Sequence, residues 1–331
     1  MTARWMRIEQ SAVLFCLSLT IALTAGALLA PRPASAQAAV TSAESEWLQD
    51  LKTWRTLREK QIDAPGGWLT LVGMEWLKPG ANSVGAAADN QIHIHGEAPD
   101  HIGLFTVSGK TVQLLSIAGG FPPDLDINGQ PAREGPLVVG VRPSIIRWHG
   151  LSMVVLDRGG RYALRIEDAD APTRKDFKGL NWYDPDPQFS VEATWTPYTP
   201  QHIEKIPTVI GTTLDLPAPG VAQFTLAGQT YTLEPVLETP DAKTLLFIVS
   251  DQTGKQTTYA GGRYLHEPFP DHGLDKPGKL ILDFNRLENS ACAYTTYASC
   301  PLPPVKNRLP IAIEAGEKRF TPDPPTASPA R

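Results

Sequence analysis

Apolar and polar residues alternate along most of the chain, a period of two that is typical of half-buried β-strands. From Trp68 onward, runs such as 91–95, 104–107, 111–115 and 152–156 alternate in this way between turn-forming residues. Short strands separated by about 8–12 residues favour a sandwich of antiparallel sheets. We therefore expect a mainly β protein, with a β-sandwich over residues 68–169 and a second antiparallel β-unit over residues 208–320.

A helical period replaces the alternation only between residues 41 and 62. Thr41 and Glu44 have the spacing of a capping box, and Pro65-Gly66-Gly67 forms a stop signal. A stripe with a period of 3.6 residues lies between these signals, made of Trp47, Leu48, Leu51, Trp54, Leu57 and Arg58. We expect an amphipathic helix within residues 37–67 that packs on a β-domain. The alternative is a helix that docks a partner protein.

Two segments of the chain carry no clear period. Residues 170–207 are rich in proline and aromatic residues, which predicts a bridge between the two β-units, with a strand resuming at residues 191–195. Residues 321–331 are rich in proline and small residues, which predicts a disordered tail.

The first 36 residues have the three parts of a secretory signal peptide. Arg4 and Arg7 precede an apolar stretch over residues 11–30, and small residues then allow cleavage after Ala36 or Ala38. An uncleaved transmembrane anchor is the alternative, since about 20 apolar residues can span a bilayer. We expect a cleaved, periplasmic or secreted protein without a membrane span after cleavage.

Composition narrows the class of protein further. The chain holds 31 prolines in 331 residues, and because proline breaks helix interiors a mainly helical fold is disfavoured. The formal net charge of −5 gives no sign of the basic face that binding to nucleic acid requires. The sequence has no G-x-S-x-G, H-E-x-x-H, P-loop or G-x-G-x-x-G motif. We therefore predict no cofactor, and the sequence leaves open whether the protein is an enzyme.

Cleavage of the signal peptide would remove Cys16 and leave Cys292 and Cys300. An even pair in an exported protein indicates a disulfide, because oxidising compartments preserve such bonds. The alternatives are a reactive thiol and half of a metal site.

The first β-region resembles a forkhead-associated sandwich. The likeness rests on the order of four landmarks: residues 71–73, 79–85, 90–94 and 126–130. Ala86 stands where that family places a phosphate-binding arginine. The resemblance therefore implies the fold and does not imply recognition of phosphothreonine.

Motifs along nearly the whole mature chain resemble the domain of unknown function 1684 (DUF1684) family. They are residues 66–73, 178–183 and 258–265 and a closing run over 282–318 that includes Cys292-Ala293-Tyr294 and Cys300-Pro301-Leu302-Pro303-Pro304. The chain departs from the family at residues 287–291, where the family reads closer to Ala-Tyr-Asn-Pro-Pro. The resemblance implies bacterial origin and this β architecture, and it implies no activity.

The segment 283–310 carries the best candidate site. Long irregular stretches inside a domain are usually functional or disordered, and the cysteine pair and prolines of this one argue against disorder. The candidate ligand-binding residues are Arg263, Tyr264, Asp283, Asn285 and Arg308. Their groups suit a carboxylate, phosphate or sugar ligand. The structural alternative is that buried arginines and asparagines satisfy the carbonyls of the loop.

Two further groups could carry chemistry. His93 and His95 would share one face of a strand near Glu97 and could hold zinc, but histidines on a solvent-facing strand are the favoured explanation, so we predict no metal site. Asp184 and Asp186 beside Trp182 could form a carbohydrate loop with paired carboxylates, or simply a turn.

Three functions follow from these observations. The leading hypothesis is an exported protein that binds a small or polymeric cell-envelope ligand through segment 283–310. The second is an envelope hydrolase with Asp283 as general base, since burial can raise the pKa of a carboxyl toward neutrality. The third is a protein–protein interaction module that uses the helix 41–62.

Overall fold

The structure is a computed structural model and describes residues 34–321. The predicted signal peptide and disordered tail lie almost entirely outside these residues. The chain divides into two compact units, Met1–Glu46 and Trp47–Arg331, and the second holds both β-regions. None of the helices in residues 34–321 combines the length and apolarity needed to cross a bilayer.

Helix α1 (Ala34–Ile62) ends where the sequence predicts and begins earlier than residue 41. Within the second unit it buries Leu51, Arg58 and Ile62, which recur at helical spacing. Leu48 and Leu57 of the predicted stripe are exposed. The buried face is therefore rotated relative to the predicted one, and Leu51 and Arg58 belong to both.

Residues 71–168 form two facing sheets, as predicted for a sandwich. Six strands pair in the order β1-β11-β10-β9-β6-β7, and five pair in the order β3-β2-β4-β5-β8. Their bounds are β1 Leu71–Trp76, β2 Gly80–Gly85, β3 Ile92–His93, β4 Gly103–Ser108, β5 Thr111–Leu115, β6 Asp126–Ile127, β7 Gln130–Pro131, β8 Gly135–Leu137, β9 Ile145–Trp148, β10 Leu151–Asp157 and β11 Tyr162–Asp168. The likeness to a forkhead-associated domain stays a prediction.

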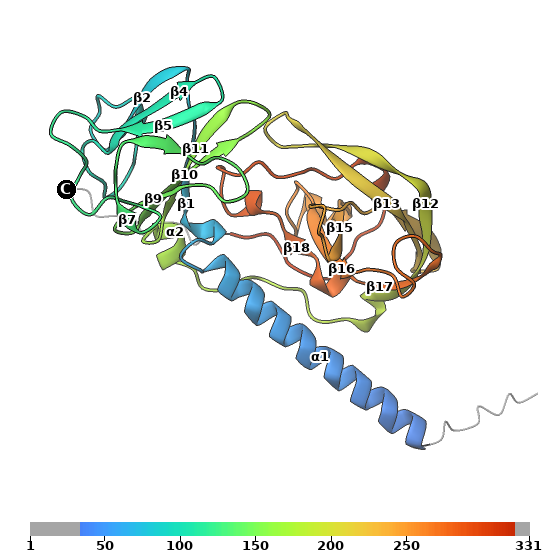
Figure 1. The fold of residues 1–331 in the computed structure, drawn as a ribbon. Helices are drawn as coiled ribbons and strands as arrows, with labels where there is room; N and C mark the ends of the chain where they lie inside the picture. The colour runs from blue at the N-terminus through green and yellow to red at the C-terminus, as the bar shows by residue number, and fades with distance from the viewer. Residues whose placement is uncertain (1–33, 322–331) are drawn as a thin grey trace, which may run out of the picture. The chain divides into compact units, whose positions relative to one another are not determined.

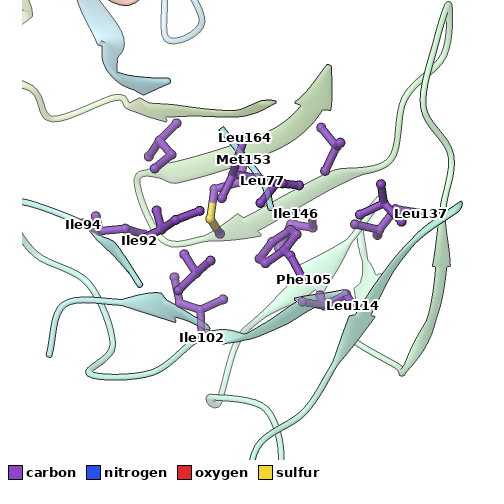
Figure 2. Packing of buried hydrophobic residues seen from close by; sticks show 14 of the residues in the cluster. Leu77, Ile92, Ile94, Ile102, Phe105, Leu114, Leu137, Ile146, Met153 and Leu164 are labelled. Carbon is purple, nitrogen blue, oxygen red and sulfur yellow. The ribbon is translucent and has the colours of Figure 1, made fainter. Parts of the chain in front are cut away.

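The sandwich core lies between the two sheets. Figure 2 shows Phe105 and Leu114 of one sheet approaching Met153 and Leu164 of the other. All four side chains are buried. Alternation along β10 and β11 therefore leaves their intervening residues, such as Val154 and Arg165, on the outer face of the sheet.

Short connecting elements lead into and out of the sandwich. A 3-10 turn, η1 (Trp68–Thr70), precedes β1, while helix α2 (Pro172–Lys175) and 3-10 turn η2 (Pro187–Phe189) follow β11.

The C-terminal β-unit contains two smaller sheets over one core. One has the order β14-β13-β12-β17 and the other β15-β16-β18. Their bounds are β12 Ser190–Pro207, β13 Thr213–Leu226, β14 Gln229–Leu233, β15 Thr244–Val249, β16 Arg263–Pro268, β17 Gly278–Asp283 and β18 Glu288–Asn289. Four 3-10 turns complete it: η3 Gln252–Lys255, η4 Phe284–Arg286, η5 Ala291–Ala293 and η6 Val305–Asn307. The protein is mainly β.

The predicted bridge over residues 170–207 ends earlier in the structure. Residues 190–207 are not part of a bridge but form β12, which pairs with both β13 and β17 and makes a long hairpin with β13 (Figure 1). Pro197 lies where the β12–β13 register shifts and Pro207 lies at the strand end. Proline is tolerated at such positions, so a proline-rich sequence still forms a strand here.

A small cluster joins the sandwich to the C-terminal β-unit. Leu71 of β1 packs with Ala291, Ala298 and Cys300. The Thr295 hydroxyl donates to the Leu71 carbonyl at 3.1 Å. Cys292 and Cys300 pair at disulfide distance, with their Cα atoms 6.1 Å apart.

Candidate functional site

Asp283 and Asn285 lie together at the end of β17, but their polar groups are occupied. The Asp283 carboxylate accepts from Trp47 Nε1 at 2.8 Å and from the Asn285 side chain at 3.0 Å. Asn285 is fully buried and exchanges two hydrogen bonds with the backbone of Asp186, each 2.9 Å long. These contacts fasten α1 and the 186 loop to turn η4.

The two predicted arginines lie in different surroundings. Arg263 is 1% exposed, and its guanidinium binds Asp251 at 2.8 Å and the Ile313 carbonyl at 2.9 Å. Arg308 is exposed just after η6. The five predicted residues therefore do not form one site, and the contacts of Arg263, Asp283 and Asn285 fit the structural alternative.

Tyr264 lines a cavity of about 300 Å³ between the sandwich and the C-terminal β-unit. The sandwich contributes side chains from the outer face of β1, β10 and β11 and from the turn after β10. They are Leu71, Met74, Leu156, Arg158 and Arg165. The opposite wall comes from β16, β18 and residues 290–301. Segment 283–310 thus supplies much of that wall.

The sandwich wall is basic. Arg165 pairs with Glu167 at 3.0 Å, whereas Arg158 has no carboxylate within ion-pair distance in the part of the chain that the structure describes. The Nε atoms of both arginines are buried and without a hydrogen-bond partner there. Burial, followed by the charge of Arg165, lowers the pKa of Arg158 below its ordinary value. Two like charges therefore face one cavity with unused donors.

The opposite wall carries a phenol, an imidazole and two carboxylates, those of Glu238 and Glu288. Tyr264 and His266 occupy alternate positions of β16, so both point to the same face. His266 Nε2 lies 3.1 Å from Glu238, and its Nδ1 lies 3.6 Å from Glu288. Burial by itself would lower the pKa of His266, but its hydrogen bond with Glu238 and the charge of Glu288 raise it. Burial raises the pKa of Tyr264, so the phenol stays protonated, and its hydroxyl donates to the Pro301 carbonyl at 2.8 Å.

A buried polar network lies beneath Arg58 and Asn289 of the cavity wall. Arg58 donates to the Asn289 carbonyl at 2.8 Å and lies 3.3 Å from Glu288. The Asn289 side chain donates to Glu317 at 2.7 Å, and the Tyr294 hydroxyl also donates to Glu317. Burial raises the pKa of Glu317, which is fully enclosed. This network fixes Asn289, whose Oδ1 is buried and without a partner among the described residues.

Sequence reasoning placed Arg58 on the periodic face of the helix without assigning it to a site, and it assigned no role to Arg158, Arg165 or His266. An arginine on or next to an alternating strand is ordinary, so nothing marked Arg158 and Arg165. His266 was taken for a surface or turn residue, although its position two residues after Tyr264 was a usable signal that the two side chains could share a face.

The predicted histidine pair is exposed, with the rings of His93 and His95 4.6 Å apart. In residues 34–321, the group whose ligand atoms could surround a metal ion is instead His202, Glu204 and Glu234. Asp186 caps turn η2, accepting from the Gln188 amide at 2.9 Å, which fits the turn reading of the 184–187 segment.

The comparisons with known proteins agree with the closing motifs of the sequence. Residues 175–318 match the model of a family described as "Protein of unknown function (DUF1684)". A solution NMR structure of an uncharacterized protein of Haloarcula marismortui is 35% identical; the match covers 44% of this chain and 78% of that chain, with a TM-score of 0.38. No curated protein matches. The chain belongs to the DUF1684 family.

Proposed function

We propose that this protein binds a small organic anion, with a carboxylate or phosphate group, in the cavity between its two β-regions. The observation that carries the proposal is Arg158, a half-buried cation with a buried, unpartnered Nε–H and no carboxylate within ion-pair distance among the described residues. The Arg158 guanidinium has one hydrogen bond, a long one of 3.4 Å from Nη1 to the Asp157 carbonyl. A partly desolvated cation without a carboxylate partner is costly, and the negative charge of an anion in the cavity would offset that cost.

The rest of the cavity supports an amphipathic ligand. Leu71, Met74 and Leu156 give the basic wall an apolar surround, and Trp68 adds an aromatic surface. A volume of about 300 Å³ is at the lower end of the range for ligand pockets, which favours a small molecule. Tyr264 and Ser290 add hydroxyl groups from the opposite wall.

This proposal keeps the expected role of segment 283–310 and adds the sandwich as the source of the cationic groups. Residues 288–291 and 297–301 of that segment line the cavity. With the predicted signal peptide, we further propose that the ligand is met in the periplasm or outside the cell.

The proposal is tested by titrating the purified protein with phenyl phosphate and with benzoate in a calorimeter, with benzyl alcohol as the uncharged probe. We expect saturable binding of at least one anion and none of benzyl alcohol. Arg158→Gln should weaken that binding at least about tenfold, since a hydrogen bond to a charged group contributes roughly 1.5–3 kcal/mol.

Arg147→Gln is the matched control, because Arg147 is exposed on β9 of the same sheet and does not line the cavity. Its affinity should equal that of the parent protein. Equal loss in both variants would show a nonspecific charge effect, and no saturable binding of either anion would contradict the proposal.

A further inference from the structure

A second polar cluster lies away from the cavity lining, where β12 passes the end of β14. His202 and Glu204 are alternate residues of β12 and share a face, and Glu234 directly follows β14. His202 Nε2 lies 3.3 Å from Glu204 Oε2 and 3.3 Å from Glu234 Oε1. All three atoms lie within 4.8 Å of one another.

Two of the three separations match those of zinc ligands. Nitrogen and oxygen atoms that each lie about 2.0–2.1 Å from a tetrahedral zinc are about 3.3 Å from each other. The distances from His202 Nε2 to the two carboxylate oxygens both have this length, and the two oxygens lie within 4.8 Å of each other. Imidazole nitrogen and carboxylate oxygen are zinc ligands, and three protein ligands leave a fourth position for water.

The ligand atoms are also held by neighbouring groups. The Tyr198 hydroxyl donates to Glu234 Oε2 at 2.6 Å, which leaves Oε1 directed at His202. Asn307 binds the backbone of Glu234 through bonds of 2.9 Å and 2.8 Å. The Glu234 side chain is only 3% exposed. Such outer contacts orient a metal ligand before the metal binds.

The ammonium group of a lysine already lies between the two carboxylates. Lys306 Nζ lies 3.1 Å from Glu204 Oε2 and 2.6 Å from Glu234 Oε1, the same two oxygens that face His202. Its side chain is 47% exposed. A flexible lysine stem with this exposure can move its ammonium into water without crossing the core.

We propose that His202, Glu204 and Glu234 form a binding site for a divalent transition metal of the zinc class, with Lys306 as a tethered competitor. The metal binds when the ammonium leaves the two carboxylates. Lys306 therefore sets the affinity of the site rather than contributing a ligand.

The test is calorimetric titration of the chelator-treated protein with Zn²⁺. Lys306→Met removes the competing charge and keeps the stem length, so we expect Zn²⁺ to bind at least tenfold more tightly than in the parent protein. Adding His202→Gln to Lys306→Met should abolish that gain. Circular dichroism and thermal unfolding establish that each variant is folded, and Glu204→Gln replaces His202→Gln if the latter does not fold.

His95→Gln, made in the Lys306→Met background, is the matched control for exposed histidines that bind Zn²⁺ adventitiously. It should leave the gain intact. An affinity in Lys306→Met equal to that of the parent protein would overturn the proposal, as would a gain that survives the loss of His202 or Glu204.

Discussion

At the scale of single residues, burial gives different roles to side chains that look equivalent in the sequence. Arg263 and Arg308 are both candidate ligand groups by composition and position. The structure buries the first against Asp251 and backbone carbonyls and leaves the second exposed. The role of an arginine here depends on which strands surround it, and its neighbours along the chain do not give that information.

Arg263→Ala should lower the free energy of unfolding by about 3–5 kcal/mol, because it leaves Asp251 buried without its partner. Arg308→Ala should change it by no more than about 0.5 kcal/mol, as is usual for exposed positions. Urea denaturation measures both. Equal stability of the two variants would show that the buried ion pair is not structural.

The pH dependence of stability should report on Glu267, which is 6% exposed on β16. Burial, assisted by the charge of Asp283, raises the pKa of Glu267 to about 8. The folded protein therefore holds one more proton than the unfolded chain between about pH 4.5 and 8, so this carboxyl makes stability fall as pH rises through that window.

Glu267→Gln should remove this fall, because the amide carries no charge and its oxygen still accepts from the Asp283 amide. The measurement is the free energy of unfolding at several pH values between 5 and 8.5. Glu314→Gln, at an exposed position, controls for the loss of one carboxylate. A stability gap between Glu267→Gln and the parent protein that does not change with pH would contradict the raised pKa.

At the scale of elements, alternation predicts where strands form but not which of them pair. The short strands of the sandwich follow the alternating runs closely, since one face of each is buried. The long strand β12 was partly hidden by its prolines, because proline signals a turn unless pairing continues around it. The buried face of α1 also differed from the face that the sequence predicted, because the surface against which a helix packs decides which side is covered.

Gly220 of β13 tests how closely the β12–β13 hairpin packs. A Cβ atom at this position would lie 2.5 Å from the Thr196 carbonyl oxygen and 2.6 Å from the ring of Trp195, which is fully buried. Gly220→Ala should therefore cost roughly 1–3 kcal/mol of stability through overpacking. Gly254→Ala is the control, because its Cβ would meet its nearest neighbour at 3.5 Å. Similar urea midpoints for the two variants would refute the close approach.

At the scale of the whole second unit, the two β-regions have separate cores and a small contact. One core lies within residues 77–166 and the other within residues 193–315. The Leu71 cluster joins them and also borders the cavity. The ligand site that we propose therefore depends on a contact between regions that each hold their own core.

Leu71→Asp should weaken this contact, because an aspartate at a site that is 5% exposed avoids desolvation when the two regions separate. We expect differential scanning calorimetry to show two resolved transitions in the variant. Val141→Asp, at a fully exposed position, should leave the thermogram of the parent protein unchanged. A single cooperative transition in Leu71→Asp would show that the two cores are coupled by other contacts.

The sequence by itself determined the local features of this protein. Alternation predicted the β class and the sandwich, and the helical period predicted α1, since each depends on residues that are near one another in the chain. The even pair of cysteines in a chain expected to be exported predicted their pairing. The closing motifs likewise indicated the family. Of the five predicted ligand residues, Tyr264 alone lines the cavity.

Only the tertiary structure determined where the cavity lies and which residues line it. Arg158 follows one strand of the sandwich and Tyr264 belongs to a strand about a hundred residues later, so only packing of the two β-regions places them on opposite walls. Packing also decided which polar groups became buried without partners. Such groups favour a ligand site because their desolvation costs free energy that a hydrogen-bonding partner can offset.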